Sequence, residues 1–249
     1  MAALTDLEPT QGDADDAARC YALVPCAGVG LRAGAAGPKQ YATLAGRAVV
    51  AHTLAALAEV PRLTATLVVL APQDAAFEAH APGFHGLRAW LSRSGGESRA
   101  ASVAAGLQAL RERGVRDHDW VLVHDAARCL LRPAWVDRLI DACLADPVGG
   151  LLALPLADTL KRVDAQAERV SATLPRADKW LAQTPQMFRL GLLQRALYEA
   201  QAAGHTITDE ASAVEALGLA PLLVAGEFEN LKLTWPADFL LAARLLETR

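Results

Sequence analysis

Short apolar runs alternate with helix-like segments along most of this chain, and this alternation limits the folds that it can adopt. Strands that are apolar along their whole length are typical of a parallel sheet covered on both faces. With right-handed crossovers between the strands, the sequence predicts an α/β fold with a doubly wound, mostly parallel sheet, whose ligands bind beyond the carboxyl ends of the strands. We expect strands at residues 21–24, 66–70, 88–92, 120–123 and 149–155, and helices at residues 49–58, 98–113 and 134–145.

One stretch, residues 158–176, breaks this alternation. Two runs of alternating polar and apolar residues flank a polar tip, which is the pattern of a β-hairpin. Because an isolated hairpin is only marginally stable in water, we expect this arm, about residues 157–178, to pack on another surface such as a second copy of the chain. We expect residues 20–249 to form a single domain that carries the arm, and the acidic first 19 residues to form a disordered tail.

Composition narrows the class of protein. A net charge of −4 gives no support for a nucleic-acid-binding protein, which should be basic. The four cysteines form no Cys-x-x-Cys pair, so neither a disulfide framework nor a zinc site is expected, and reduced thiols indicate a cytoplasmic protein. No apolar run reaches the roughly 18 residues of a membrane span. The six histidines show no metal-site spacing, and we expect His124 to be structural.

The first predicted strand runs into a glycine-rich loop that carries two cations. Gly28 and Gly30 let the backbone approach a ligand closely, and Arg32 and Lys39 would neutralise its negative charge. The loop is not a Walker motif, because Pro38 precedes the lysine. We interpret it as a loop that holds a nucleoside triphosphate for attack at the α-phosphate.

Further motifs follow this loop in a fixed order. They are Gly95-Gly96-Glu97-Ser98-Arg99, His124-Asp125-Ala126-Ala127-Arg128, Asp158-Thr159-Leu160-Lys161, Gln183-Thr184-Pro185-Gln186, Thr208-Asp209-Glu210 and Asn230-Leu231-Lys232. Together with the loop, the set resembles the cytidylyltransferases that make 4-diphosphocytidyl-2-C-methylerythritol in the non-mevalonate isoprenoid pathway. The resemblance implies a Rossmann-like nucleotidyltransferase fold, a homodimer joined by the β-arm, and Mg²⁺. Cys129, where the family usually has proline, and Trp235, where it has a smaller or polar residue, are departures.

The expected chemistry is a single nucleotidyl transfer. The phosphate of 2-C-methyl-D-erythritol 4-phosphate would attack the α-phosphorus of CTP, and pyrophosphate would leave. A phosphomonoester has its second pKa at about 6 and is largely dianionic at neutral pH, so no general base is needed. Alignment and charge neutralisation would then supply the catalysis, with Arg32, Lys39 and Lys232 as the catalytic cations.

The remaining candidate residues divide between the two substrates. On the nucleotide side they are Ala27, Gly28, Gly30, Gly95, Gly96, Ser102 and Asp125. The metal ligands stay open: Mg²⁺ would be held mainly by the CTP phosphates, with Asp125 as a candidate. For the acceptor, the resemblance nominates Arg128, Thr159, Arg176, Thr184 and Thr208. Arg176 would reach into the partner's site.

Three other functions fit parts of the pattern. The same chemistry on another polyol phosphate, such as ribitol 5-phosphate, is poorly separated by sequence. A non-catalytic nucleotide-sensing protein would be expected to lose a phosphate-binding cation, and Arg32, Lys39 and Lys232 all remain. A nicotinamide-dependent oxidoreductase would carry a complete Gly-x-Gly-x-x-Gly, whereas this chain has alanine at the last position, Ala33.

Overall fold

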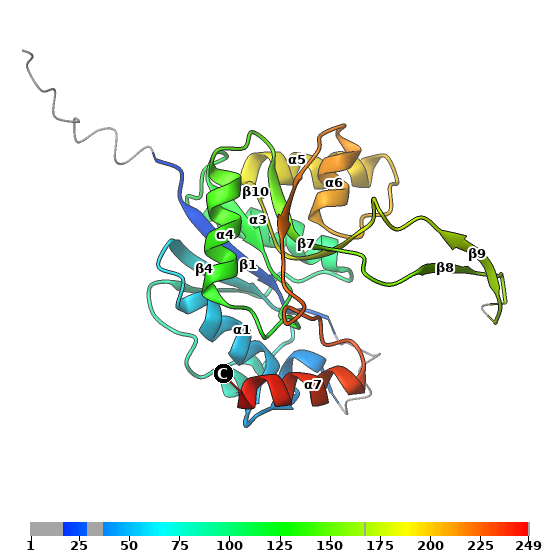
Figure 1. Cartoon of the computed structure of the whole chain (residues 1–249). Coiled ribbons are helices and arrows are strands. Elements are labelled where there is room, and N and C mark those ends of the chain that lie inside the picture. Colours follow the sequence, from blue (N-terminus) through cyan, green and yellow to red (C-terminus); the bar gives the residue numbers. More distant parts are fainter. Residues whose placement is uncertain (1–16, 29–36, 167, 249) are drawn as a thin grey trace, which may run out of the picture.

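A seven-stranded sheet forms the centre of the protein in the computed structural model, which describes residues 17–28, 37–166 and 168–248 (Figure 1). Every neighbouring pair is parallel except those of β10, which is antiparallel to both of its neighbours. The predicted α/β fold with a mostly parallel sheet is confirmed. In spatial order the strands are β11 (Leu222–Ala225), β7 (Gly149–Pro155), β10 (Trp180–Arg189), β6 (Trp120–Val123), β1 (Cys20–Pro25), β4 (Leu63–Val69) and β5 (Ala89–Ser92).

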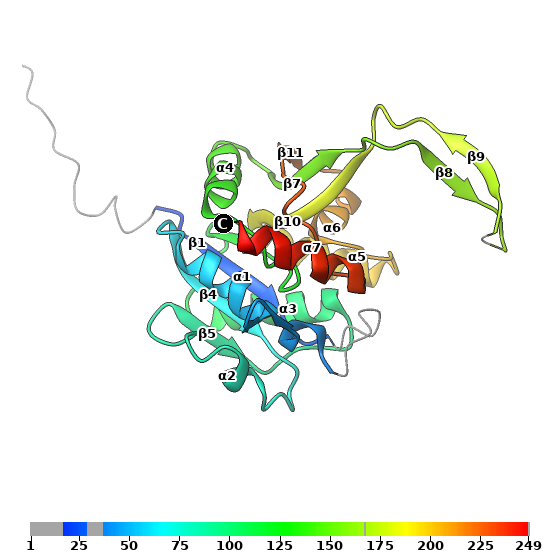
Figure 2. The ribbon, with the colours of Figure 1, turned by 60° about the horizontal axis from the view of Figure 1, so that its bottom comes forward.

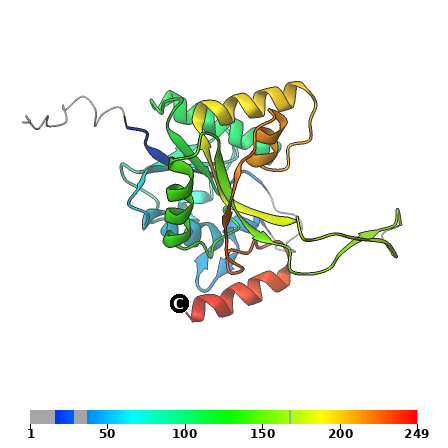
Figure 3. The same cartoon turned by 45° about the horizontal axis from the view of Figure 1, so that its top comes forward.

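Helices cover both faces of this sheet, as Figure 3 shows. Side chains alternate along β1: Ala22 and Val24 join a core with residues of α1 and α4, whereas Tyr21 and Leu23 join a core with residues of α3, α5 and α6. The sheet is therefore buried on both sides, as its apolar strands predict. The helices of the first face are α1 (Val49–Ala58), α4 (Pro133–Leu144) and the short α2 (Phe77–His80); those of the second are α3 (Arg99–Glu112), α5 (Leu190–Ala202) and α6 (Glu210–Ala216).

The order of the strands places a crevice between β1 and β6. From β1 the chain passes to β4 and β5 on one side and then crosses to β6 on the other side. In doubly wound sheets the carboxyl ends of such a strand pair diverge and leave room for a ligand. Cys26–Gly28 follow β1, and His124 and Asp125 follow β6, so two of the sequence motifs meet there.

A third apolar cluster holds the last helix, α7 (Pro236–Glu247), against the body (Figure 2). Leu44 and Val49, which lie in β2 (Thr43–Leu44) and α1, pack there with Leu233 and Ala242. The turn η2 (Lys39–Tyr41) and the strand β3 (Arg47–Ala48) flank β2. This packing brings the segment before α7, with Lys232, next to Lys39 at the end of the glycine-rich loop.

The predicted hairpin is present as β8 (Leu160–Val163) and β9 (Val170–Leu174), which pair antiparallel in a sheet of their own. Figures 1 and 2 show this arm extending away from the body. Val163 and Val170 on it are exposed, as are Trp180 and Leu181 where β10 begins. The role of the arm in a dimer stays a prediction.

Several expectations concern residues 1–16 and 29–36, which lie outside the described residues. These are most of the predicted N-terminal tail, Gly30 and Arg32. The four cysteines are buried and free. Within the described ranges, no helix combines the length and the apolar character that crossing a bilayer would require.

Candidate active site

Two adjoining cavities open at the carboxyl ends of β1 and β6. The larger, of about 400 Å³, extends from Ala27 and Gly28 to the start of α3. The smaller, of about 270 Å³, is bounded by residues 182–184 and Gln186 of β10 and by Thr208 and Asp209. Arg99, Asp125 and Lys232 line both cavities and therefore form their common wall.

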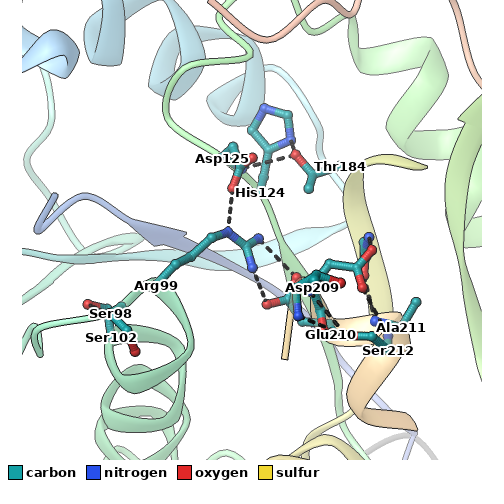
Figure 4. A network of polar contacts seen from close by, with 12 residues as sticks. Ser98, Arg99, Ser102, His124, Asp125, Thr184, Asp209, Glu210, Ala211 and Ser212 are labelled. Atoms are coloured by element: carbon teal, nitrogen blue, oxygen red, sulfur yellow. Dashed lines mark hydrogen bonds and ion pairs between the residues drawn. The ribbon is translucent and has the colours of Figure 1, made fainter. Parts of the chain in front are cut away.

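That wall is a chain of alternating charges, part of which Figure 4 shows. Nε of Arg99 donates to Asp125 Oδ1 at 2.7 Å, and Nζ of Lys232 lies 2.7 Å from Asp125 Oδ2. The two terminal nitrogens of Arg99 donate to the two oxygens of Glu210, at 2.7 and 2.9 Å. Asp125 thus accepts from a different cation on each oxygen. Residues from α3, from α6, from the segment after β6 and from the segment before α7 meet at this point.

The surroundings of Asp125 favour its ionised form. Burial alone would raise the pKa of its carboxyl, but Arg99 and Lys232 outweigh burial and hold that pKa well below its usual range. At Arg99 the carboxylates of Glu210 and Asp125 outweigh the effect of burial and raise the pKa of the guanidinium. Asp125 is therefore suited to fix cations or accept hydrogen bonds and is not a general acid or base near neutral pH.

Around the larger cavity, contacts of a lysine and of the backbone hold the surrounding loops in place. Nζ of Lys39 donates to the carbonyl of Leu233 at 2.5 Å, so the end of the glycine-rich loop is tied to the segment that carries Lys232. Gly95 packs so closely that a Cβ placed on it would lie 2.3 Å from the Cβ of Ala27. The Ser102 hydroxyl accepts from the backbone N–H of Gly96 at 3.1 Å, which fixes the loop before α3. A role of these residues in reading a base stays a prediction.

The smaller cavity contains a half-buried cation, Arg128, without an acidic partner among the described residues. Arg128 donates to the carbonyls of Asn230, at 2.6 Å, and Ala182, at 3.2 Å, and forms no salt bridge within the described part of the chain. Burial lowers the pKa of its guanidinium, with Asp125 opposing that effect. Since carbonyls orient the guanidinium without neutralising it, the positive charge of Arg128 is available to an anion in this cavity.

Thr184 and His124 form hydrogen bonds that hold the backbone of Asp125 in place. The Thr184 hydroxyl oxygen accepts from the backbone N–H of Asp125 at 3.0 Å and lies 3.1 Å from Nδ1 of His124. Nε2 of His124 lies 3.1 Å from the carbonyl of Arg128, which can only accept, so the proton is on Nε2 and Thr184 donates to Nδ1. Burial lowers the pKa of His124 to about 4, so the ring is neutral. This geometry supports the structural interpretation of His124.

The candidate residues are not all brought together within one chain. Those that line the two cavities are Ala27, Gly28, Lys39, Gly96, Ser102, Asp125, Arg128, Thr184, Thr208 and Lys232. Thr159 and Arg176 are exposed near the arm and line neither cavity.

Sequence reasoning assigned no role to Arg99, Glu210 or Asn230, although each belongs to a motif quoted above. Asn230 is fully buried, and its amide donates to Thr184 O at 2.9 Å and Gln183 Oε1 at 3.2 Å. What could have indicated these residues is that each is a charged or amide residue in the same motif as a candidate already chosen. Their partners could not be inferred from spacing, because Arg99 and Glu210, for example, are 111 positions apart in the sequence.

The described residues hold no group of three or more His, Cys, Asp or Glu side chains that could bind a metal ion. Mg²⁺ is commonly bound through one or two carboxylates together with substrate phosphates. Asp125 is the buried carboxylate of the larger cavity, and both of its oxygens already accept from cations. These side chains fit a metal ion that is held mainly by the ligand's own oxygens.

Three comparisons with known proteins bear on this site. The family model of IspD, 2-C-methyl-D-erythritol 4-phosphate cytidylyltransferase, matches residues 20–248. The chain is 55% identical over 230 residues to the 2-C-methyl-D-erythritol 4-phosphate cytidylyltransferase of Paraburkholderia phytofirmans, covering 92% of this chain and 96% of that one. The chain is also 60% identical over 235 residues to the bifunctional enzyme IspD/IspF of Albidiferax ferrireducens. That match covers 94% of this chain but only 54% of the bifunctional enzyme.

Solved structures agree with the sequence matches. A crystal structure of 4-diphosphocytidyl-2C-methyl-D-erythritol synthase superposes with a TM-score of 0.80 at 40% identity, covering 92% of this chain and 99% of that one. The 2-C-methyl-D-erythritol 4-phosphate cytidylyltransferase of Thermus thermophilus gives a TM-score of 0.74 at 33% identity, covering 92% and 99%. The ordered motifs, the doubly wound sheet and the match over nearly all of the described residues lead to one conclusion: this chain belongs to the 2-C-methyl-D-erythritol 4-phosphate cytidylyltransferase family.

Proposed function

We propose that this protein transfers CMP from CTP to 2-C-methyl-D-erythritol 4-phosphate, which yields 4-diphosphocytidyl-2-C-methyl-D-erythritol and pyrophosphate. The observation that carries the proposal is the pair of cavities that share Arg99, Asp125 and Lys232. A transfer between two phosphorylated substrates needs both to bind at once, with their reacting phosphates at a common boundary. A cation-lined wall between two cavities is suited to that task.

In the proposed reaction, an oxygen of the acceptor phosphate attacks the α-phosphorus of CTP. The bond from that phosphorus to the bridging oxygen of pyrophosphate breaks, and pyrophosphate leaves with the electron pair. Lys232 is proposed for this step because Asp125 holds its ammonium group on the wall that both cavities share. Its charge would offset the repulsion between the two approaching phosphates.

The two substrates would be held by different cations. Lys39, together with Arg32 of the glycine-rich loop, is proposed for the triphosphate of CTP, and Gly28, Gly30 and Ala27 for close backbone approach. Arg128, which no carboxylate neutralises within the described residues, is proposed for the acceptor. An arginine fork presents two donors to a phosphate in the geometry that the phosphate oxygens need.

Mg²⁺ is proposed as the metal ion of the reaction, bound mainly by the phosphate oxygens of CTP with Asp125 close by. When bound, it would neutralise part of the triphosphate charge and favour departure of pyrophosphate. We expect chelation by EDTA to abolish turnover and added Mg²⁺ to restore it, measured as pyrophosphate release. Full activity in EDTA after dialysis would contradict a role for the metal.

We also propose that the protein acts as a homodimer in which the arm completes the partner's site. Thr159 and Arg176 lie outside both cavities of their own chain, and exposed apolar side chains occur on the arm and at its base. A two-stranded hairpin of this kind gains stability when it packs on another surface. In this arrangement Arg176 would bind the acceptor in the neighbouring site.

The deciding experiment measures pyrophosphate release from CTP and Mg²⁺ with 2-C-methyl-D-erythritol 4-phosphate and, under matched conditions, with ribitol 5-phosphate. Strong preference for the methylerythritol phosphate supports the proposal. Preference for ribitol 5-phosphate would keep the chemistry and reassign the acceptor. Binding of CTP without turnover of either acceptor would favour a nucleotide-sensing protein.

A further inference from the structure

Glu210 is a buried carboxylate for which the proposed reaction has no direct use. It is the first residue of α6 and is 1% exposed. Both of its oxygens accept from Arg99, at 2.7 and 2.9 Å. It lines neither cavity, so it would not touch a substrate.

The helix that carries Glu210 does not depend on its side chain. Asp209 and Ser212 form the capping box of α6, and the Gln186 side chain accepts from the backbone N–H of Ala211 at 2.8 Å. A buried ion pair is weak grounds for stability, because removing the charges from water costs several kcal/mol. The position of Glu210 therefore calls for another explanation.

The explanation lies in how Arg99 shares its donors. An arginine fork binds a carboxylate best through two parallel N–H bonds. Glu210 occupies both terminal nitrogens of Arg99, which leaves Nε for Asp125 Oδ1. Asp125 Oδ2 then remains for Lys232, 2.7 Å away.

We propose that Glu210 is a positioning residue: by holding the fork of Arg99, it keeps Asp125 available to orient Lys232 toward the boundary between the two substrates. Without the Glu210 carboxylate, the Arg99 fork turns to both oxygens of Asp125 and displaces the ammonium of Lys232. This inference rests on the proposed function for its catalytic consequence, but the displacement of Lys232 is a property of the protein alone.

The first test compares Glu210→Gln with Glu215→Gln, an exposed position on the same helix. We expect Glu210→Gln to lower kcat at least about tenfold, up to about a hundredfold, because displacing a reacting group by about 1 Å has effects of this size. Glu215→Gln should leave kcat unchanged. Unchanged kcat in Glu210→Gln would overturn the proposal.

A second arm separates positioning from a structural effect. The loss caused by Glu210→Gln is measured again in an Arg99→Lys background, where no fork remains to be redirected. We expect the loss to become small there, whereas a structural defect would give the same factor in both backgrounds and would overturn the proposal. Should Glu210→Gln not fold, Glu210→Asp replaces it, since the shorter side chain cannot hold both nitrogens.

A third readout needs no turnover. The rate at which an amine-specific acylating reagent labels Lys232 is followed by mass spectrometry without substrates. We expect labelling to be severalfold faster in Glu210→Gln than in the wild-type protein or Glu215→Gln, because the ammonium has lost its carboxylate partner. Equal rates would overturn the positioning role even if the enzyme proves active. Faster labelling in a protein with no cytidylyl transfer would leave the positioning role standing while the proposed function fails.

Discussion

At the scale of single residues, the site depends on cations whose neighbours fix them in place. Lys39 is an example, because its ammonium is held by the carbonyl of Leu233 next to Lys232. The glycine-rich loop and the segment before α7 are 194 residues apart in sequence at this contact. One hydrogen bond thus brings two proposed phosphate ligands to the same part of the larger cavity.

Replacing Lys39 by alanine should reduce kcat by about a hundredfold to a thousandfold. Loss of one preorganised group that faces developing charge has effects of this size. The measurement is pyrophosphate release at saturating CTP and acceptor. Arg195→Ala on α5, which removes an exposed cation that lines neither cavity, is the control and should retain full activity. Near-normal activity of Lys39→Ala would remove this lysine from the site.

His124 should make the stability of the protein depend on pH. Burial lowers its pKa from 6.5 to about 4, so between these values the unfolded chain binds a proton that the folded chain excludes. The stabilisation is fully present above about pH 6.5 and is lost as the pH falls toward 4, by up to roughly 3 kcal/mol. Urea unfolding at a series of pH values should therefore give a flatter curve for His124→Gln. Parallel curves for the two proteins would contradict this prediction.

At the scale of elements, the approach of the loop at Gly95 to the end of β1 limits what the larger cavity tolerates. A methyl group at Gly95 would meet both the side chain of Ala27, at 2.3 Å, and the carbonyl of Leu70, at 2.7 Å. The loop would have to move away from β1, which would widen the cavity where the nucleotide is proposed to bind.

We expect Gly95→Ala to lower the free energy of unfolding by about 1–3 kcal/mol, the usual cost of overpacking, and to raise KM for CTP while KM for the acceptor changes little. Thermal unfolding and steady-state kinetics measure the two effects. Gly83→Ala is the matched control, since a methyl group there meets nothing within 4 Å. Equal effects on both KM values would show that the loop does not act on the nucleotide alone.

The sequence predicted best those helices and strands whose pattern of apolar residues is the same from end to end. Helix α1 and strands β6 and β7 match the predicted bounds residue for residue, because their patterns are uniformly apolar or periodic. Strand β4 begins three residues before the predicted 66–70, because Leu63–Ala65 extend the pairing with β1.

Strand β10 could not be predicted, because its residues contradict a central strand. It contains Pro185 and the polar residues Gln183, Thr184 and Gln186, yet it lies between β6 and β7. Its pairing with β7 is interrupted between Ala182 and Gln186, so the proline falls where no ladder hydrogen bond is required. The polar side chains find partners such as Asn230 and Asp209, which are distant in sequence.

The residues of the candidate site could also be predicted only in part from the sequence. Lys39, Asp125 and Lys232 follow from charge placed at strand ends and loops, whereas Arg128 was nominated by the family resemblance. The structure brings all four to the two cavities. Glu210 was missed because its function depends on a pairing with Arg99 that only the tertiary fold creates. The metal ion and the cytoplasmic location stay predictions.

At the scale of the whole molecule, the arm is the feature that a single chain does not explain. It extends from β7 and β10 away from the body (Figures 1 and 2). Arg176, which lies between β9 and β10, lines neither cavity. If a partner receives it, every complete site contains residues of both chains.

Mixing two defective variants tests this arrangement. Arg176→Ala and Lys232→Ala should each be strongly impaired as pure proteins, and Arg176→Ala should still bind CTP almost normally. After the two are unfolded together and refolded, half of the dimers combine both chains and each of these has one intact site, so about a quarter of wild-type activity should return. A mixture no more active than its components would place Arg176 in the site of its own chain.

An arm that completes a neighbour's site also ties catalysis to the amount of protein. The turnover per chain would fall on dilution below the dissociation constant of the dimer and would recover when more protein, even chains impaired by Lys232→Ala, is added. The rate at low concentration would then rise with the square of the chain concentration. The supply of product would respond to expression level more steeply than it would for an enzyme that works as a monomer.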